Sequence, residues 1–314
     1  MKDTFPFEEG YSLWGENGIL PEDIRQGNVG DCWFIAAASA MAERSERLER
    51  LFINQDDKKT GGIEINGIYG LQFYALLMPV TITIDDYLPF ETAQGKAIYA
   101  SVGQDKSVWG PLLEKGFAKF HGSYEAIASG TPERALNTIA GSPHQEFQHS
   151  AITVDELWEK MVRHGEQQHA MITTGVYGDN KFNLQPNNAY TQLSTVKLSN
   201  GQRLVKVRNP MGTETYDGPY SDKSSKWTDK FREEAEWSDV NDGIFFVPIE
   251  VYHSEFGVTY INYDTYNMCR TDFLALNDTH DKKGTGQCGE NCTMHEFTLS
   301  SQCKQEVIVS ASVW

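Results

Sequence analysis

Apolar and polar residues recur along the chain with two different periods, which divide it into a helix-rich first part and a strand-rich second part. Residues 1–31 are punctuated by glycine and proline, so we expect an irregular lead-in. Residues 32–52 show helical spacing, apolar and alanine-rich at the start and charged toward the end. Residues 63–88 alternate in the manner of short strands. A second helix is predicted over residues 109–120, where bulky apolar residues recur at helical spacing.

The second part opens with a connecting segment and a helix that has a clear start signal. Residues 130–143 contain Thr-Pro and Gly-Ser-Pro turn signals, and we interpret them as the crossover between two halves. Thr153 and Glu156 have the spacing of a capping box, which predicts a helix start. Residues 170–176 and 244–251 have the composition of strands.

A β-hairpin is the clearest local prediction in the chain. Residues 189–198 and 203–208 are both strand-like, and the turn between them contains an Asn-Gly pair, which favours a tight hairpin turn. Antiparallel pairing around that turn brings Asn188 and Asn209 to the same open end. The hairpin therefore predicts that these two side chains are neighbours.

A lone cysteine stands where the first predicted helix begins. Asp31 is a good N-cap residue, which puts Cys32 at the first helical position. There the free backbone amides and the helix dipole favour a thiolate, although the charge of Asp31 opposes it. Gln26 lies upstream on a glycine-punctuated loop, from which its side-chain amide could donate to an oxyanion. An isolated cysteine is more often an inert core residue, so the role of Cys32 has to be judged from the residues around it.

Charge and cysteine usage narrow the class of protein. Lys and Arg number 27 against 44 Asp and Glu, a net charge of −17, which argues against nucleic acid or an anionic membrane as a partner. No apolar run has the length of a membrane span, and the first residues lack a signal-peptide core. Five cysteines are an odd number, as expected for free thiols in a reducing compartment. We therefore expect a cytoplasmic protein.

Three separate motifs together resemble one enzyme family. The segment Gln26-Gly27-x-x-Gly30-Asp31-Cys32-Trp33 resembles the nucleophile segment of the calpains, papain-like cysteine proteases of the cytosol. Residues 109–125, WGPLLEKGFAKFHGSYE, resemble the helix that follows in that family. Residues 205–212, VKVRNPMG, resemble its asparagine segment. The motifs occur in the family's order, and the resemblance extends from about residue 18 to residue 252.

The resemblance assigns a role to each candidate site residue. Cys32 is the expected nucleophile, and Gln26 with the Cys32 backbone amide would stabilise the oxyanion. Asn209 would orient the catalytic histidine. The implied reaction is peptide hydrolysis through a thioester, with a polypeptide as substrate. Whether a regulatory subunit takes part is left open by the sequence.

The general base is where the sequence departs from the family. Asn188-Ala189-Tyr190 resembles the family's His-Ala-Tyr strand, with asparagine at the histidine position. Asparagine cannot accept and return a proton near neutral pH. We therefore expect weak or no hydrolysis, and the chain would then be a peptide-binding or scaffolding pseudoprotease. The alternative is an active endopeptidase with His169 as the base, although the hairpin brings Asn188 and not His169 beside Asn209.

The family's calcium sites are depleted in this sequence. The positions that carry over are two in each site: Gly18, Asp23, Asp222 and Asp242. Other positions where acids are expected hold uncharged residues, although Asp105 and Glu214 are close enough in sequence to compensate. Calcium takes about six to eight oxygen ligands, so we predict no certain cofactor and name calcium as the one candidate.

We therefore predict an α+β fold of the papain-like calpain type in three parts. Residues 1–142 would form a helical half with Cys32, and residues 143–255 a β-rich half with Asn209. Residues 256–314 resemble the beginning of a C2-like β-sandwich. A whole sandwich needs about 100 residues, so this last part would be incomplete.

Overall fold

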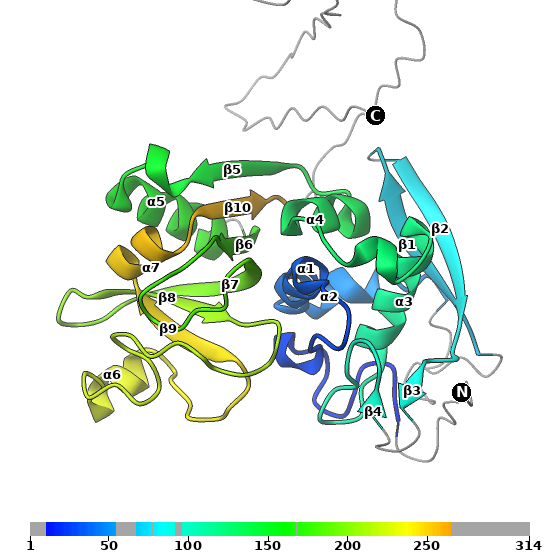
Figure 1. Cartoon of the computed structure of the whole chain (residues 1–314), viewed down its shortest axis with the longest axis horizontal. Helices are drawn as coiled ribbons and strands as arrows, with labels where there is room; N and C mark the ends of the chain where they lie inside the picture. The colour runs from blue at the N-terminus through cyan, green and yellow to red at the C-terminus, as the bar shows by residue number, and fades with distance from the viewer. Residues whose placement is uncertain (1–10, 55–66, 77, 92–95, 168, 265–314) are drawn as a thin grey trace, which may run out of the picture.

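One helix, α1 (Cys32–Ala42), lies at the centre of the first half of the molecule (Figure 1). The computed structural model describes residues 11–54, 67–76, 78–91, 96–167 and 169–264. All residues of α1 after Cys32 are buried. A helix that is apolar all round is stable only where other elements cover every face, and α1 is covered in this way. We call residues 11–142 the first half and residues 143–264 the second half.

The elements that surround α1 complete the first half. They are η1 (Pro21–Asp23), α2 (Ser45–Glu49), β1 (Ile68–Ala75), β2 (Met78–Asp85), β3 (Phe90–Glu91), β4 (Lys96–Ala97), α3 (Trp109–His121), η3 (Glu125–Ile127) and α4 (Pro132–Ala140). Phe117 of α3 stacks on Phe34 of α1, with ring centroids 4.6 Å apart. The Trp33 indole Nε1 donates to the Ile127 carbonyl at 2.8 Å. These contacts fix the residues that directly follow Cys32.

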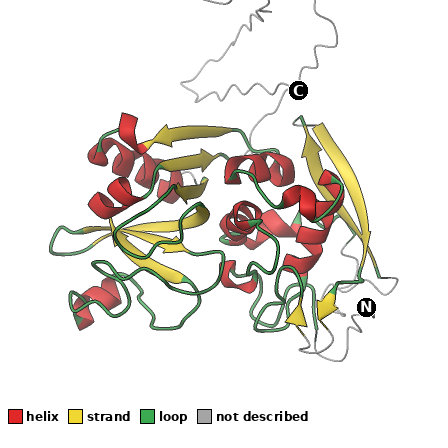
Figure 2. Ribbon diagram, in the orientation of Figure 1, coloured by secondary structure: helices red, strands yellow, loops and turns green. Residues whose placement is uncertain are grey.

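The second half is built on an antiparallel sheet, drawn in yellow in Figure 2. Its six strands, labelled in Figure 1, have the order β5-β10-β6-β7-β8-β9. Its elements are β5 (His144–Gln148), η4 (His149–Ala151), α5 (Val154–Met161), the π-helical turn η5 (Val162–Gln167), β6 (Met171–Val176), β7 (Asn188–Lys197), β8 (Arg203–Arg208), α6 (Asp229–Glu234), β9 (Ile244–Pro248), α7 (Ile249–Glu255) and β10 (Val258–Asn262). One face of the sheet contacts α1, and the opposite face forms a core with α5 and α7.

Local signals locate several of these elements correctly. The Thr153 hydroxyl accepts from the Glu156 backbone amide while the Glu156 carboxylate accepts from the Thr153 amide, which is the expected capping box. Strands β7 and β8 form the predicted hairpin, and Gly201 in its turn has a φ of +88°. The helix predicted over residues 32–52 is instead two helices, α1 and α2.

Three predictions about the second half and its border need correction. Residues 130–143 hold a helix, α4, because Pro132 starts it and Gly141 ends it with a left-handed backbone. The strand predicted over residues 244–251 ends at Pro248, where α7 begins.

The third correction concerns the border at residue 255. Strand β10 inserts between β5 and β6 in the same sheet, so the second half extends beyond that border. The β-sandwich expected over residues 256–314 lies, from residue 265 onward, outside the described residues. Within the described ranges, no helix is both long and apolar enough to cross a bilayer.

Candidate active site

Cys32 is the first residue of α1 and lies at the contact between the two halves. Its sulfur is in hydrogen-bonding contact with the backbone amide of Ala189, the second residue of β7. Burial raises the pKa of the Cys32 thiol and the charge of Asp31 adds to this, whereas the amides of Ala189 and Trp33 oppose it. The net shift is upward, so the thiol form is favoured at neutral pH.

Asp31 occupies the N-cap position, but its side chain does not cap the helix. Its backbone carbonyl accepts from the amides of Phe34 and Ile35, while its fully buried carboxyl group faces Glu114 of α3. Burial raises the pKa of Asp31 to about 7. Burial, together with the adjacent Asp31 charge, also raises the pKa of Glu114 well above its ordinary value. Two buried acidic groups therefore face each other next to the start of α1.

Gln26 is held on the loop before α1. One of its side-chain amide hydrogens is donated to the Val29 carbonyl at 2.8 Å. Its backbone amide donates to the Pro210 carbonyl of the second half at 2.9 Å. A Cβ atom on Gly27 would lie 1.9 Å from the Tyr99 carbonyl oxygen, so only glycine permits this path of the loop.

Asn209 follows β8 directly, and its side chain is fixed by three hydrogen bonds. Its Nδ2 donates to the Thr213 carbonyl at 3.0 Å, and its Oδ1 accepts from the Met211 amide at 3.1 Å. The same oxygen accepts from Asn188 Nδ2 at 3.3 Å. Both asparagine side chains are buried. The hairpin thus brings together the two residues that its register predicted.

The strand register also places His169. Val176, at the end of β6, pairs with Asn188, whereas Met171, at the start of β6, pairs with Asn262. His169 precedes Met171, and the five residue steps from Met171 to Val176 alone span about 16 Å at about 3.3 Å per residue. His169 is exposed, and its carbonyl accepts a hydrogen bond from Arg47. It therefore lies at the opposite end of the strand from Asn188.

Among the described residues, the groups that act on the Cys32 thiol are Asp31, Trp33 and Ala189, and no histidine is one of them. The buried imidazole of His149 instead bonds the Thr259 hydroxyl at 2.8 Å. Two further neighbours of the site, Glu114 and Arg208, were not predicted from the sequence. Glu114 is a charged residue within the apolar face of a helix, and Arg208 is a charged residue at the end of a strand. Such a local pattern does not by itself assign a residue to a site.

The first pair of calcium positions lies between the lead-in and α3. Asp23 accepts from the Leu20 amide at 2.8 Å, and burial with the charge of Asp105 raises its pKa to about 6. Asp105 in turn accepts from the amides of Asn17 and Ser107. These carboxylates are thus engaged with backbone donors. Gly18 has a φ of +82°, and a Cβ atom added to it would meet no atom of the described residues within 4 Å.

The second pair lies beside the loop before β9. Glu214 accepts from the amides of Asp242 and Gly243, both at 3.0 Å. Burial raises the pKa of Asp222 to about 7, with Glu214 as the next contribution. Within the described ranges, no three acidic, histidine or cysteine side chains are arranged to hold a metal ion. No chemical step is therefore assigned to a cation.

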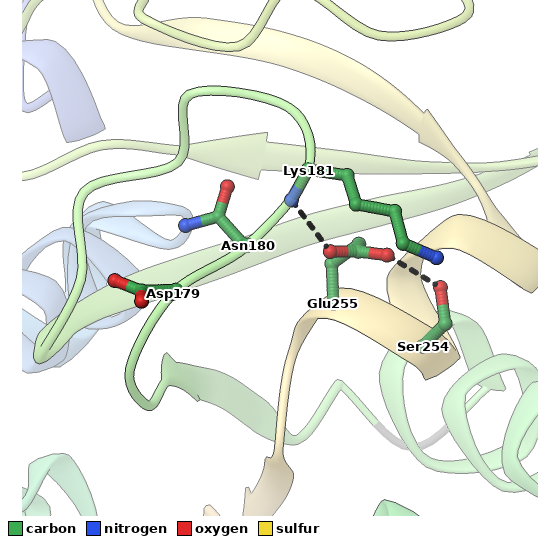
Figure 3. Close-up of a pocket in the computed structure, with 5 residues that line it drawn as sticks. All are labelled: Asp179, Asn180, Lys181, Ser254 and Glu255. Carbon is green, nitrogen blue, oxygen red and sulfur yellow. Dashed lines mark hydrogen bonds between the residues drawn. The ribbon is translucent and has the colours of Figure 1, made fainter.

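A polar surface hollow of about 400 Å³ lies between the β6–β7 loop and the end of α7 (Figure 3). Its residues are Asp179, Asn180, Lys181, Ser254 and Glu255. The Glu255 carboxylate accepts from the Lys181 backbone amide at 3.0 Å and from the Ser254 hydroxyl at 3.1 Å. The hollow includes none of the predicted site residues.

Comparison with known proteins points to one protein family. The sequence profile of the calpain family cysteine protease matches residues 8–262. Calpain-9 of Rattus norvegicus is 31% identical over 273 residues, which cover 83% of this chain and 38% of that protein. Calpain-14 of Homo sapiens is 34% identical over 65% of this chain and 30% of its own length. The calpain-type cysteine protease DEK1 of Arabidopsis thaliana is 29% identical over 77% of this chain and 11% of its own length.

The chain thus spans much less than half of the length of these relatives. The profile match covers both halves of the described structure and ends at the last residue of β10. By this match and by its mixed helix and sheet core, the chain belongs to the calpain family of cysteine proteases.

Proposed function

We propose that this chain is a calpain-type peptide-binding core in which hydrolysis is weak or absent because Asn188 stands where the general base is required. The observation that carries the proposal is the hydrogen bond from Asn188 Nδ2 to Asn209 Oδ1 at 3.3 Å. In a papain-like site the orienting asparagine accepts in this way from an imidazole. An amide can copy the donor but has no basic nitrogen with which to accept a proton.

The state of the thiol supports the same proposal. Burial and Asp31 raise the pKa of Cys32, and no imidazole acts on it within the described residues. A neutral thiol is a poor nucleophile, because the thiolate is the attacking species. Without a base to take its proton, Cys32 would react slowly with a peptide carbonyl.

The contacts of the Gln26 loop support a retained binding role. The Gln26 side chain donates to the Val29 carbonyl, and its backbone amide donates to the Pro210 carbonyl of the second half. We infer that an extended polypeptide is the ligand, as the family resemblance implies, and that the setting is cytosolic. Calcium is not part of the proposal, since the acidic groups at the inherited positions are few and partly engaged by backbone donors.

The test is to restore the base. Asn188→His, Asn188→Gln and Cys32→Ala variants are compared with the parent chain on a fluorogenic peptide library. We expect the parent to match Cys32→Ala and the histidine variant to gain on the order of 10²–10⁴-fold in rate, the range typical of general-base catalysis. Asn188→Gln, which keeps an amide, is expected to stay at the background.

The contrary result is equally specific. A parent that already cleaves in a Cys32-dependent manner, at a rate that Asn188→His does not raise, would show that Asn188 is not at the position of the base. A His169→Gln variant then tests the alternative, since only an enzyme that uses His169 would lose its activity. Binding of unstructured peptides to Cys32→Ala, measured by calorimetry, separates loss of catalysis from loss of the ligand.

A further inference from the structure

Arg208 is a fully buried cation at the contact between the two halves. It ends β8, directly before Asn209, and its side chain is 0% exposed. Its guanidinium extends into the first half, where Nη1 donates to the Ser39 hydroxyl and Nη2 donates to the Ile24 carbonyl, each at 2.7 Å. One side chain therefore bonds two segments of the other half.

Both acceptors lie on segments that carry site residues. Ser39 is on α1, the helix that begins with Cys32. Ile24 is two residues before Gln26 on the loop that leads to that helix. Arg208 itself is covalently joined to Asn209. The three residues of the expected site thus lie on the segments that Arg208 joins.

The electrostatics of this contact are unusual for a structural arginine. Both acceptors are uncharged, and Nε has no acceptor among the described residues. Burial lowers the pKa of the guanidinium to about 10, against a smaller upward effect of Glu22. A buried cation whose hydrogen-bond acceptors are neutral costs free energy that an apolar side chain at a strand end would avoid. The planar fork of arginine, however, can hold two acceptors at a fixed distance.

We propose that Arg208 is a positioning residue, which holds the Gln26 loop and the Cys32 helix of the first half in register with the Asn209 strand of the second. Two neighbouring contacts act at the same interface. The Gln26 amide donates to the Pro210 carbonyl at 2.9 Å, and the Thr191 hydroxyl donates to the Ala36 carbonyl at 2.8 Å. This role concerns the assembly of the site, so it goes beyond hydrolysis and holds whether or not the chain cleaves peptides.

A second buried arginine offers a matched control. Arg47 of α2 also joins the halves, because its Nε donates to the Asp264 carboxylate at 3.1 Å and its Nη2 to the His169 carbonyl. It is 3% exposed, much like Arg208. His169 and Asp264 lie at the end of the sheet opposite Asn188, so Arg47 should affect stability without affecting the site.

The experiment compares Arg208→Met, Arg208→Lys and Arg47→Met in the full chain. Alkylation of Cys32 is followed by mass spectrometry with two reagents, iodoacetamide and a peptidyl chloromethyl ketone, at a pH where part of the thiol is ionised. The ratio of the two rates reports whether the peptide is positioned at Cys32. Alkylation of an ionised thiol requires no general base, so this test is independent of the proposed loss of hydrolysis. Melting temperatures are measured in parallel.

We expect Arg208→Met to lower the ratio at least about tenfold, since small misplacements in such sites cost up to about 10²-fold. Arg208→Lys keeps the charge but offers a single nitrogen in place of the planar fork, so it should retain an intermediate ratio. Arg47→Met should lower the melting temperature but leave the ratio within about twofold of the parent, because its contacts to the second half, with His169 and Asp264, lie at the end of the sheet opposite Asn188.

Two results would overturn the proposal. One is a ratio for Arg208→Met equal to that of Arg47→Met at a similar loss of stability, which would make Arg208 a stabilising residue only. The other is a parent ratio equal to that of a small free thiol, because there would then be no assembled site to hold. If Arg208→Met does not fold, the comparison is made with Arg208→Lys below its melting temperature.

Discussion

Asn188 and Asn209 share a hydrogen bond across the open end of the β7–β8 hairpin, from Nδ2 to Oδ1 at 3.3 Å. Asn209 is also held by the Met211 amide and the Thr213 carbonyl, so its orientation does not depend on residue 188 alone. An imidazole placed at position 188 would therefore find its acceptor already oriented.

This arrangement predicts a dependence on Asn209 that appears only after the base is restored. In the Asn188→His background, Asn209→Ala should lower kcat by on the order of tenfold or more, because the imidazole loses the group that fixes its orientation. KM should change much less, since Asn209 is buried and is not expected to touch the peptide. Steady-state kinetics on one peptide provide the measurement. Equal kcat values for the single and double variants would contradict the assigned role.

Gly27 offers a second prediction, based on space alone. In a Gly27→Ala variant the new Cβ would lie 1.9 Å from the Tyr99 carbonyl oxygen, which is backbone and cannot move aside cheaply. We expect a loss of about 1–3 kcal/mol in the free energy of unfolding, as for other overpacked sites, and a displaced Gln26 loop. Urea denaturation and the Cys32 alkylation ratio measure the two effects.

The matched control for this change is Gly175→Ala on β6. There the nearest atoms to a new Cβ lie at 3.4 Å, which is ordinary van der Waals contact. It should cost less stability than Gly27→Ala and leave the alkylation ratio unchanged. If both variants behave alike, the close approach of Tyr99 does not shape the loop.

The sequence predicts best where a local signal specifies the structure. The Asn-Gly turn, the β7–β8 alternation and the capping box at Thr153 depend on neighbours within a few residues, and each appears where expected. The same locality brings Asn188 beside Asn209, because a hairpin register is fixed by its turn. Local signals could not identify α4, because residues such as Pro132 and Gly141 border helices as readily as they form turns.

Long-range contacts explain what the sequence could not predict. Strand β10 pairs with β5 and β6, which are separated from it by many intervening elements, so its place in the sheet follows from tertiary packing. Arg208 and Glu114 become site neighbours only when the halves meet, or when α3 packs behind α1. Charge within an apolar pattern marks such residues, but the pattern does not reveal what they contact.

The buried acidic pair predicts how stability varies with pH. Asp31 and Glu114 both have raised pKa values in the folded chain, with burial as the first cause. The folded state then holds protons that the unfolded chain has released, so their contribution is fully present below the unfolded pKa and is lost as the pH rises toward about 7. Glu114→Gln should therefore lose less stability than the parent as the pH rises through that window.

Urea denaturation of the parent and Glu114→Gln at several pH values measures the difference. As the pH rises from the unfolded pKa of Asp31, 3.8, toward about 7, the parent should lose more stability than the variant. Glu156→Gln is the control, because that glutamate is exposed and its pKa is lowered by its bonds to Thr153. If the difference in unfolding free energy between the parent and Glu114→Gln does not change with pH, the folded pair holds no extra proton.

The buried imidazole of His149 predicts the opposite slope. Its Nε2 bonds the Thr259 hydroxyl at 2.8 Å, and its ring stacks on that of His253 with centroids 5.5 Å apart. Burial lowers its pKa from 6.5 to about 4, so the unfolded chain binds the proton first. The contribution of His149 is therefore present above pH 6.5 and is lost as the pH falls toward about 4, with a limit of about 3 kcal/mol.

His149→Gln should keep a hydrogen bond to Thr259, lose some stability at pH 7 and show a flatter decline on acidification than the parent. His253→Gln removes the neighbouring ring and should change the slope less, since the charge of His253 is a smaller influence on His149 than burial is. Urea titrations of the three chains at neutral and acidic pH give the comparison, and parallel curves for parent and His149→Gln would mean that His149 titrates normally in the folded chain.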